Sequence, residues 1–179
     1  MALEDFRSKG PSGGLATMLT GMGSLAYGEL AGERIRLGLL LNDPEEEQDC
    51  FSDNTHWSHY YDAVGISNVY RGRYQRTDGS VVGSAGLEAF LHQHEPALHA
   101  EMNARLEETE SAMRVMVDLG EAGQPFDMLI AQGNTEGEAV VNRVVEALME
   151  ETRSIEKIIN ALQLQNVSIE GSSSLPERS

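Results

Sequence analysis

Hydrophobic residues recur along most of this chain at three- and four-residue steps, the spacing of one face of an α-helix. The first run covers residues 14–41 and predicts one long helix with Ser12 as its N-cap. Glycine is disfavoured inside a helix, yet Gly21, Gly28 and Gly32 lie near one face of this one. We therefore expect a second helix to pack closely against that face.

A second helix is predicted to begin at Ser52 or Asp53, since both are good N-cap residues. It runs to about Tyr74, and Gly65 marks a candidate bend within it. The stretch 79–86 is rich in Gly and Ser and is therefore interpreted as a connector.

Two more long helices follow a short helical piece at Leu87–His94. One begins at Pro96, which suits a first helical turn, and ends near Leu119. The other is capped by Thr135, runs to Leu162 and carries the cleanest helical stripe of the chain. The pattern predicts an all-α, four-helix-bundle-like domain with short extra helices, in which facing helices would build any site.

The remaining segments lack such a stripe. Residues 42–49 (NDPEEEQD) are interpreted as a solvated loop; calcium binding is the alternative, although the ordered ligand spacing of an EF-hand is absent. We expect an N-terminal extension at 1–13, the helical bundle at 14–165 and a flexible tail at 166–179, which has no amphipathic pattern to bury.

The overall charge narrows the range of partners. With 13 basic and 29 acidic side chains, the 179-residue chain has a formal charge of −16. This charge repels nucleic acid and anionic membrane surfaces and attracts cations. We expect no nucleic-acid partner and, because no apolar stretch is long enough, no membrane span.

The cysteine content limits the kinds of site that this chain can form, and the N-terminus bears on its cellular location. Cys50 is the single cysteine, which excludes an internal disulfide and a Cys-based zinc site. The start, MALEDFRSKGPSGG, has acidic residues where a signal peptide needs a basic one. Either the protein is cytoplasmic or this chain lacks the leader of a longer one.

Two groups of histidines are candidate metal ligands. His92, His94 and His99 lie on either side of Pro96, so they straddle a helix start; a solvated helix terminus is the favoured interpretation and metal ligation the alternative. The HExxH spacing of metalloproteases is absent there.

The second group is His56 and His59, which are three residues apart on one predicted helix. Together with a carboxylate from another helix they could hold a transition metal. The favoured alternative is that Asp53 caps the helix at His56 while His59 lies at the surface.

Charged residues also interrupt the first helix. Glu29 and Glu33 are four residues apart, with Arg34 and Arg36 beside them. These side chains either face solvent or form a polar site within the bundle. The second alternative arises because the apolar neighbours leave too little polar face on the helix for all of them.

Several segments resemble the C-terminal half of imelysin-like proteins over roughly residues 14–165. They are 21–33 (GMGSLAYGELAGE), 50–56 (CFSDNTH), 68–74 (NVYRGRY) and 126–130 (FDMLI). The resemblance implies an extracytoplasmic helical protein of the periplasm or cell envelope, peptidase-like or iron-regulated, built from two related bundles. The functional site would lie between the bundles, with this chain forming one wall.

The resemblance also implies which residues line that wall. They are Glu29, Glu33, Arg34, Asp53, Asn54, Thr55 and His56, with His59 beside them. The implied metal ligands are His56, Glu29 and Asp53, and the implied ion is iron or zinc. The family signature Gly-x-His-x-x-Glu, which belongs to the N-terminal half, does not occur in this chain.

Three functions remain open. The leading hypothesis is an envelope module of iron uptake that contributes ligands to a metal-linked site. The second is a metallopeptidase in which the metal activates water and a Glu acts as base. The third is a non-catalytic helical interaction module. The partner in each case is a second helical bundle, either the missing N-terminal half or another copy of this chain.

Overall fold

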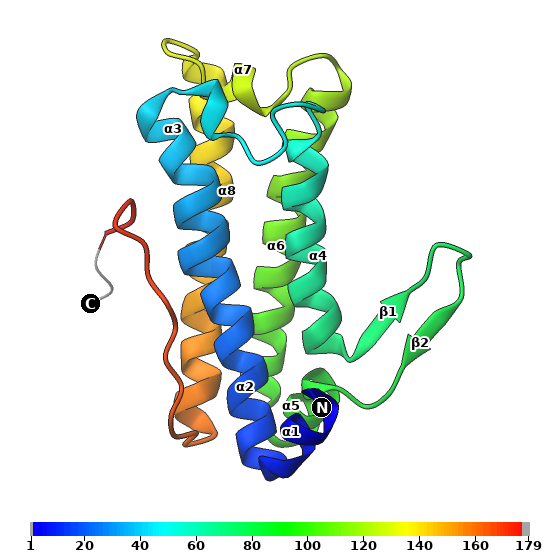
Figure 1. Cartoon of the computed structure of the whole chain (residues 1–179). Helices are drawn as coiled ribbons and strands as arrows, with labels where there is room; N and C mark the ends of the chain where they lie inside the picture. Colours follow the sequence, from blue (N-terminus) through cyan, green and yellow to red (C-terminus); the bar gives the residue numbers. More distant parts are fainter. Residues whose placement is uncertain (1, 177–179) are drawn as a thin grey trace.

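A computed structural model describes residues 2–176, apart from the side chains of Ala2, Leu3 and Asp5, and confirms the all-α bundle (Figure 1). The long elements are α2 (Gly10–Ser24), which continues through the π-helix η1 (Leu25–Arg36) into α3 (Leu37–Leu41), then α4 (Thr55–Arg71), α6 (Pro96–Glu121) and α8 (Thr135–Ala161). The short elements are α1 (Ala2–Ser8), the 3₁₀ turn η2 (Pro44–Glu46), α5 (Leu87–His94), α7 (Phe126–Ile130) and the strands β1 (Arg73–Gln75) and β2 (Val81–Gly83). Within residues 2–176, no helix combines the length and apolarity needed to cross a bilayer.

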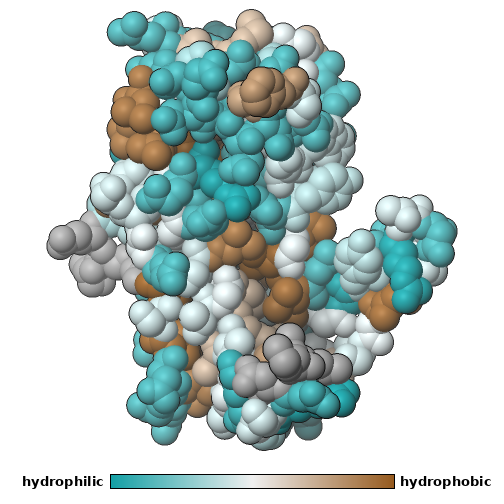
Figure 2. All heavy atoms as spheres, in the orientation of Figure 1, coloured by the Kyte–Doolittle hydropathy of each residue, from teal (hydrophilic) through white to brown (hydrophobic). Residues whose placement is uncertain are grey.

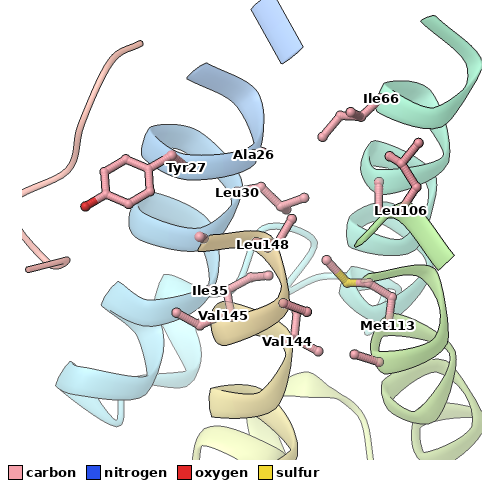
Figure 3. Packing of buried hydrophobic residues seen from close by; sticks show 14 of the residues in the cluster. Ala26, Tyr27, Leu30, Ile35, Ile66, Leu106, Met113, Val144, Val145 and Leu148 are labelled. Carbon is pink, nitrogen blue, oxygen red and sulfur yellow. The ribbon is translucent and has the colours of Figure 1, made fainter. Parts of the chain in front are cut away.

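The long helices share one apolar core. α8 packs against both η1 and α6, and α4 packs against α6 and η1. Leu30, Met113 and Leu148 meet between these helices and are fully buried (Figure 3). Burying a side chain of this size stabilises a fold by roughly 1.5–3 kcal/mol, so the core is the main source of stability.

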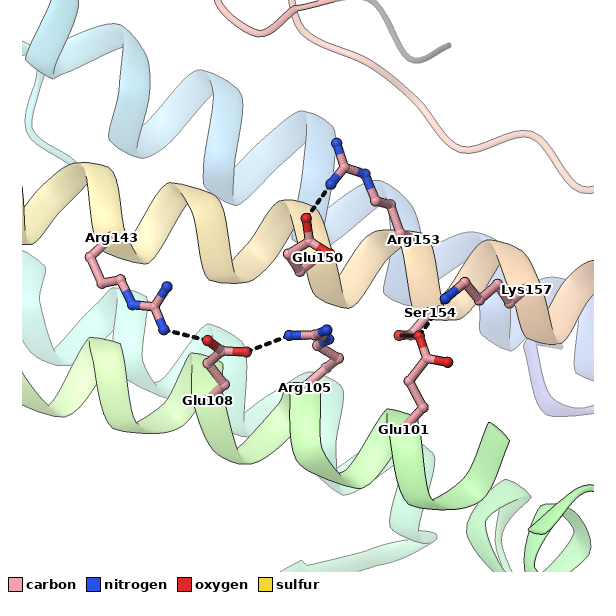
Figure 4. A network of polar contacts seen from close by, with 8 residues as sticks. All are labelled: Glu101, Arg105, Glu108, Arg143, Glu150, Arg153, Ser154 and Lys157. Atoms are coloured by element: carbon pink, nitrogen blue, oxygen red, sulfur yellow. Dashed lines mark hydrogen bonds and ion pairs between the residues drawn. The ribbon is translucent and has the colours of Figure 1, made fainter. Parts of the chain in front are cut away.

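Ion pairs on the outer face join α6 to α8 (Figure 4). Glu108 of α6 pairs with Arg105 at 2.7 Å and with Arg143 of α8. Glu101 of α6 accepts a hydrogen bond from Lys157 of α8 at 2.7 Å. Exposed pairs such as these contribute at most about 1 kcal/mol each, so they orient the helices more than they stabilise them.

The ends of α4 differ from the predicted ones. The helix begins at Thr55 with Asn54 as N-cap, because Asp53 adopts a left-handed conformation with φ 49°. It ends at Arg71 because Gly72 is left-handed, with φ 64°. The predicted caps at Ser52 or Asp53 and the predicted end near Tyr74 were therefore wrong, and the helix passes through Gly65 uninterrupted.

An antiparallel hairpin replaces the expected end of that helix and the connector after it. β1 and β2 pair Arg73 with Gly83, Tyr74 with Val82, and Gln75 with Val81. The hairpin projects from the side of the bundle at the end of α4 (Figure 1). All residues of both strands are exposed, so no hydrophobic alternation marked them in the sequence.

The first long helix also starts earlier than predicted. α2 begins at Gly10 with Pro11 in its first turn, and Lys9, not Ser12, holds the N-cap position. Residues before position 14 are thus largely helical, and α1 packs against α2. The end near Leu41 was correct: Asn42 adopts a left-handed conformation there, with φ 51°.

The glycine face of this helix holds the C-terminal segment of the chain and not a second helix. A Cβ at Gly28 would lie 2.7 Å from the Glu170 carbonyl oxygen, and one at Gly32 would lie 2.2 Å from the Ser172 Cβ. Ile169 and Leu175 are 8% and 7% exposed. The expectation that the tail has nothing to bury was wrong for 166–176, and residues 177–179 lie outside the described part.

We expect Gly28→Val to detach this segment, because the new side chain takes the place of the Glu170 carbonyl. Amide hydrogen exchange over 167–176 should accelerate. Gly21→Ala is the matched control: its Cβ meets nothing within 4 Å, so it should leave exchange unchanged and stabilise α2 by up to about 1 kcal/mol. Equal exchange rates in the wild type, Gly28→Val and Gly21→Ala would contradict the packing of this segment against the helix.

Candidate functional site

Arg34 connects η1 to α4. Its Nε and Nη2 donate to Oε1 of Glu29 at 3.0 and 2.9 Å, and its Nη1 donates to Oδ2 of Asp62 at 3.0 Å. Glu29 and Arg34 are five residues apart, the hydrogen-bonding interval of a π-helix. Burial raises the pKa of Asp62, and the Arg34 guanidinium opposes that rise. The π-helical segment thereby presents Arg34 as a link between two carboxylates.

The connector before α4 is held to the same helix. The Asp49 backbone N–H donates to the Thr55 hydroxyl at 3.0 Å, and the Ser58 hydroxyl donates to the Asp49 carboxylate. The sequence interpretation missed Asp49, Ser58 and Asp62. Asp62 could have been found, since it lies three residues after His59 on the same helix.

His59 lies in the core and not at the surface, which corrects the favoured interpretation. It is fully buried, neither ring nitrogen has a hydrogen-bond partner among the described residues, and its ring meets Phe126 edge-on at 5.4 Å. Burial, together with the nearby Arg34 charge, lowers the pKa of His59 to about 3. The imidazole is therefore neutral at physiological pH.

His56 is also buried but faces α6. Its Nε2 lies 3.6 Å from Oε1 of Glu121, and its ring covers Gly120, where a Cβ would lie 2.6 Å from the ring. Glu121 also accepts a hydrogen bond from Trp57 Nε1 at 2.7 Å, and this bond lowers its pKa. No hydrogen bond from Asp53 caps the backbone at His56, so that expectation was wrong.

The remaining predicted wall residues are at the surface or the helix start. Glu29, Glu33, Asp53 and Asn54 are exposed, whereas Thr55 is buried. The structure does not bring the proposed ligands together: His56 faces Glu121, and Glu29 pairs with Arg34. Among the described residues, no three His, Cys, Asp or Glu side chains are grouped to hold a metal ion. The predicted ligands, as the described residues place them, therefore do not form a metal centre without further donors.

The histidines around Pro96 form a helix junction. His92 and His94 are exposed, the rings of His92 and His99 meet at 5.0 Å, and His99 Nε2 lies 3.9 Å from Oε1 of Glu88. This arrangement agrees with the favoured interpretation of a solvated helix terminus.

Two buried carboxyl groups escaped the sequence interpretation. Glu151 of α8 is 1% exposed, and neither of its oxygens has a hydrogen-bond partner within 3.5 Å among the described residues. Burial raises its pKa to about 8, and the nearby Thr109 hydroxyl opposes that rise. Glu47 accepts a hydrogen bond from the Asp127 backbone at 3.2 Å, and burial, followed by the Asp127 charge, raises its pKa. Glu151 had a signal, because it lies three residues after Leu148 on the apolar stripe.

Comparison with known proteins identifies the family of this chain. The model of the imelysin family, peptidase M75, matches residues 2–155. Among curated proteins, no match was found. The family match covers most of the helical bundle, and the chain belongs to the imelysin family.

Proposed function

We propose that this chain acts in the cell envelope as a non-catalytic module of iron acquisition. In this proposal it forms one wall of a metal-linked site, and a second helical bundle forms the other. Family membership supports the two-bundle arrangement, and the surface of η1 supports the position of the wall.

The observation that best supports this proposal is the exposed acidic face beside Arg34. Glu29 and Glu33 project from η1 into solvent, and Arg34 holds Glu29 in place through two hydrogen bonds. Carboxylate oxygens are ligands for iron and zinc, but two of them are too few for a closed site. A partner bundle that supplies further donors and displaces Arg34 from Glu29 would complete the coordination.

A second copy of this chain serves as the partner in the test. Light scattering after size exclusion should show that added Zn²⁺ or ferric citrate shifts the chain from monomer to dimer. Glu29→Gln/Glu33→Gln should weaken this shift by about tenfold or more in metal concentration, since both exposed ligands are removed.

Glu107→Gln/Glu136→Gln is the matched control, because it removes two exposed carboxylates on α6 and α8 and the same total charge. It should dimerise like the wild type. An unchanged mass at all metal concentrations, or equal loss in both double variants, would count against the proposed wall.

A further inference from the structure

A recess lies between α4 and the hairpin, and the proposed function leaves it unused. Its volume is about 1220 Å³. We call it the arginine groove, and its lining includes Tyr61, Gly65, Val69, Arg71, Arg73 and Arg76. Figure 2 shows the hairpin as a lobe that stands off the body, with this hollow beside it.

The groove is locally basic in a strongly acidic protein. Arg71, Arg73 and Arg76 line it, whereas the whole chain carries a charge of −16. Arg71 pairs with Glu110 at 3.4 Å, and Arg76 Nη1 donates to Ser80 Oγ at 3.5 Å, but neither Arg73 nor Arg76 pairs with a carboxylate of a described residue. Asp78 at the hairpin turn accepts a hydrogen bond from the Ser80 backbone. The guanidinium groups of Arg73 and Arg76 thus carry charge that no described carboxylate neutralises directly, which favours an anionic partner.

The groove is also apolar enough to bury side chains. Tyr61, Val69, Tyr74 and Val82 are exposed by 61%, 43%, 54% and 43%. Large side chains left in contact with water on neighbouring elements are typical of interaction sites. Gly65 adds room, because a Cβ there would meet nothing within 4 Å.

The third feature that favours a binding role for the groove is the hairpin, whose outer strand edges are unpaired. β1 and β2 pair only with each other, so the outer edge of each strand presents unpaired N–H and C=O groups. Such edges accept an extended peptide as an added strand, in which backbone hydrogen bonds give affinity and alternate side chains give specificity. A phosphate polymer or a lipid surface would gain nothing from these edges, because neither has backbone N–H and C=O groups that pair with a strand.

We propose that the arginine groove binds an extended acidic peptide segment of a partner protein, with glutamate or aspartate side chains on Arg73 and Arg76 and apolar side chains against Tyr61 and Val69. The segment adds as a strand to the edge of the hairpin. This surface is independent of the acidic face of η1 and needs no metal.

The test uses the full chain, without metal, and a dye-labelled peptide of alternating glutamate and valine. Fluorescence anisotropy should show saturable binding that weakens as salt is raised. Arg73→Glu/Arg76→Glu should weaken it tenfold or more. Gly65→Phe should do the same by filling the groove, and it leaves the charge unchanged and the helix intact because phenylalanine is the better helix former.

Arg143→Glu/Arg153→Glu is the matched control, since it makes the same charge change on exposed positions of α8. It should bind the peptide like the wild type, and a peptide of alternating lysine and valine should not bind. The proposal fails if no saturable binding occurs or if the control variant loses as much as the groove variants. It also fails if anionic lipid vesicles or single-stranded DNA bind the groove more tightly than the acidic peptide.

Discussion

Replacing Glu151 with methionine should raise the stability of this protein at alkaline pH by about 2–4 kcal/mol. The Glu151 carboxyl is buried in the bundle without a hydrogen-bond partner among the described residues, and methionine fills a similar volume with no polar atoms. Chemical denaturation at pH 8.5 and at pH 5 measures the effect.

The pH dependence follows from the raised pKa of Glu151, about 8 in the folded state against an ordinary value of 4.5. Between these values the folded state holds a proton that the unfolded state releases, so stability falls as pH rises from about 4.5 to about 8. The largest loss is roughly 4–5 kcal/mol, at 1.36 kcal/mol per pKa unit.

Two further variants separate charge from packing at this position. Glu151→Gln should abolish the pH dependence without the full gain in stability, because its amide is neutral but still unpaired. Glu146→Gln, at an exposed position of the same helix, should retain the wild-type pH dependence. A wild-type stability that is flat from pH 5 to 8.5 would show that Glu151 is hydrated or paired.

Phe126→Ala should destabilise the protein by about 3–5 kcal/mol, since it removes a fully buried ring from the core. The cavity would also admit water to His59, whose ring meets Phe126 at 5.4 Å. The pKa of His59 should then rise from about 3 toward its ordinary value of 6.5. Denaturation and an NMR titration of the imidazole signals measure the two effects.

Met128→Ala is the control on the same short helix, because Met128 is 48% exposed. It should lower the free energy of unfolding by less than about 0.5 kcal/mol, and His59 should show no titration between pH 5 and 8. Should Phe126→Ala fail to fold, Phe126→Leu provides a smaller cavity with the same direction of change. A His59 that titrates near 6.5 in the wild type would contradict its buried position.

Most of the fold could be predicted from the sequence, because a long helix with one buried face carries hydrophobic residues at regular three- and four-residue intervals. α5 was predicted with its observed bounds, and α6 and α8 end within two residues of the prediction. The hairpin left no stripe because it is exposed on both faces, although the Asp78–Gly79 pair was a recognisable hairpin-turn signal. The packed C-terminal segment was missed because it is extended, buries the apolar side chains of Ile169 and Leu175 without a periodic pattern, and is otherwise held by hydrogen bonds such as that from Ser174 Oγ to the Gly32 carbonyl.

The candidate site was predictable only in part. The sequence placed Glu29 and Arg34 on one helix, but their contact depends on π-helical geometry, which the three- and four-residue pattern does not reveal. His56 and His59 were expected to point the same way, yet His56 meets Glu121 and His59 meets Phe126. The tertiary structure decides which neighbouring helix packs against each face, and residue spacing along one helix does not reveal it.

Elemental analysis across a size-exclusion peak of the iron- or zinc-loaded chain is the direct test of the proposal that this chain forms one wall of a metal-linked site, with Glu29→Gln/Glu33→Gln run alongside. We expect about one ion per pair of chains in the dimer fraction, metal-free monomer, and little metal in the double variant. A metal-free dimer, or metal that persists unchanged in the double variant, would contradict the proposal.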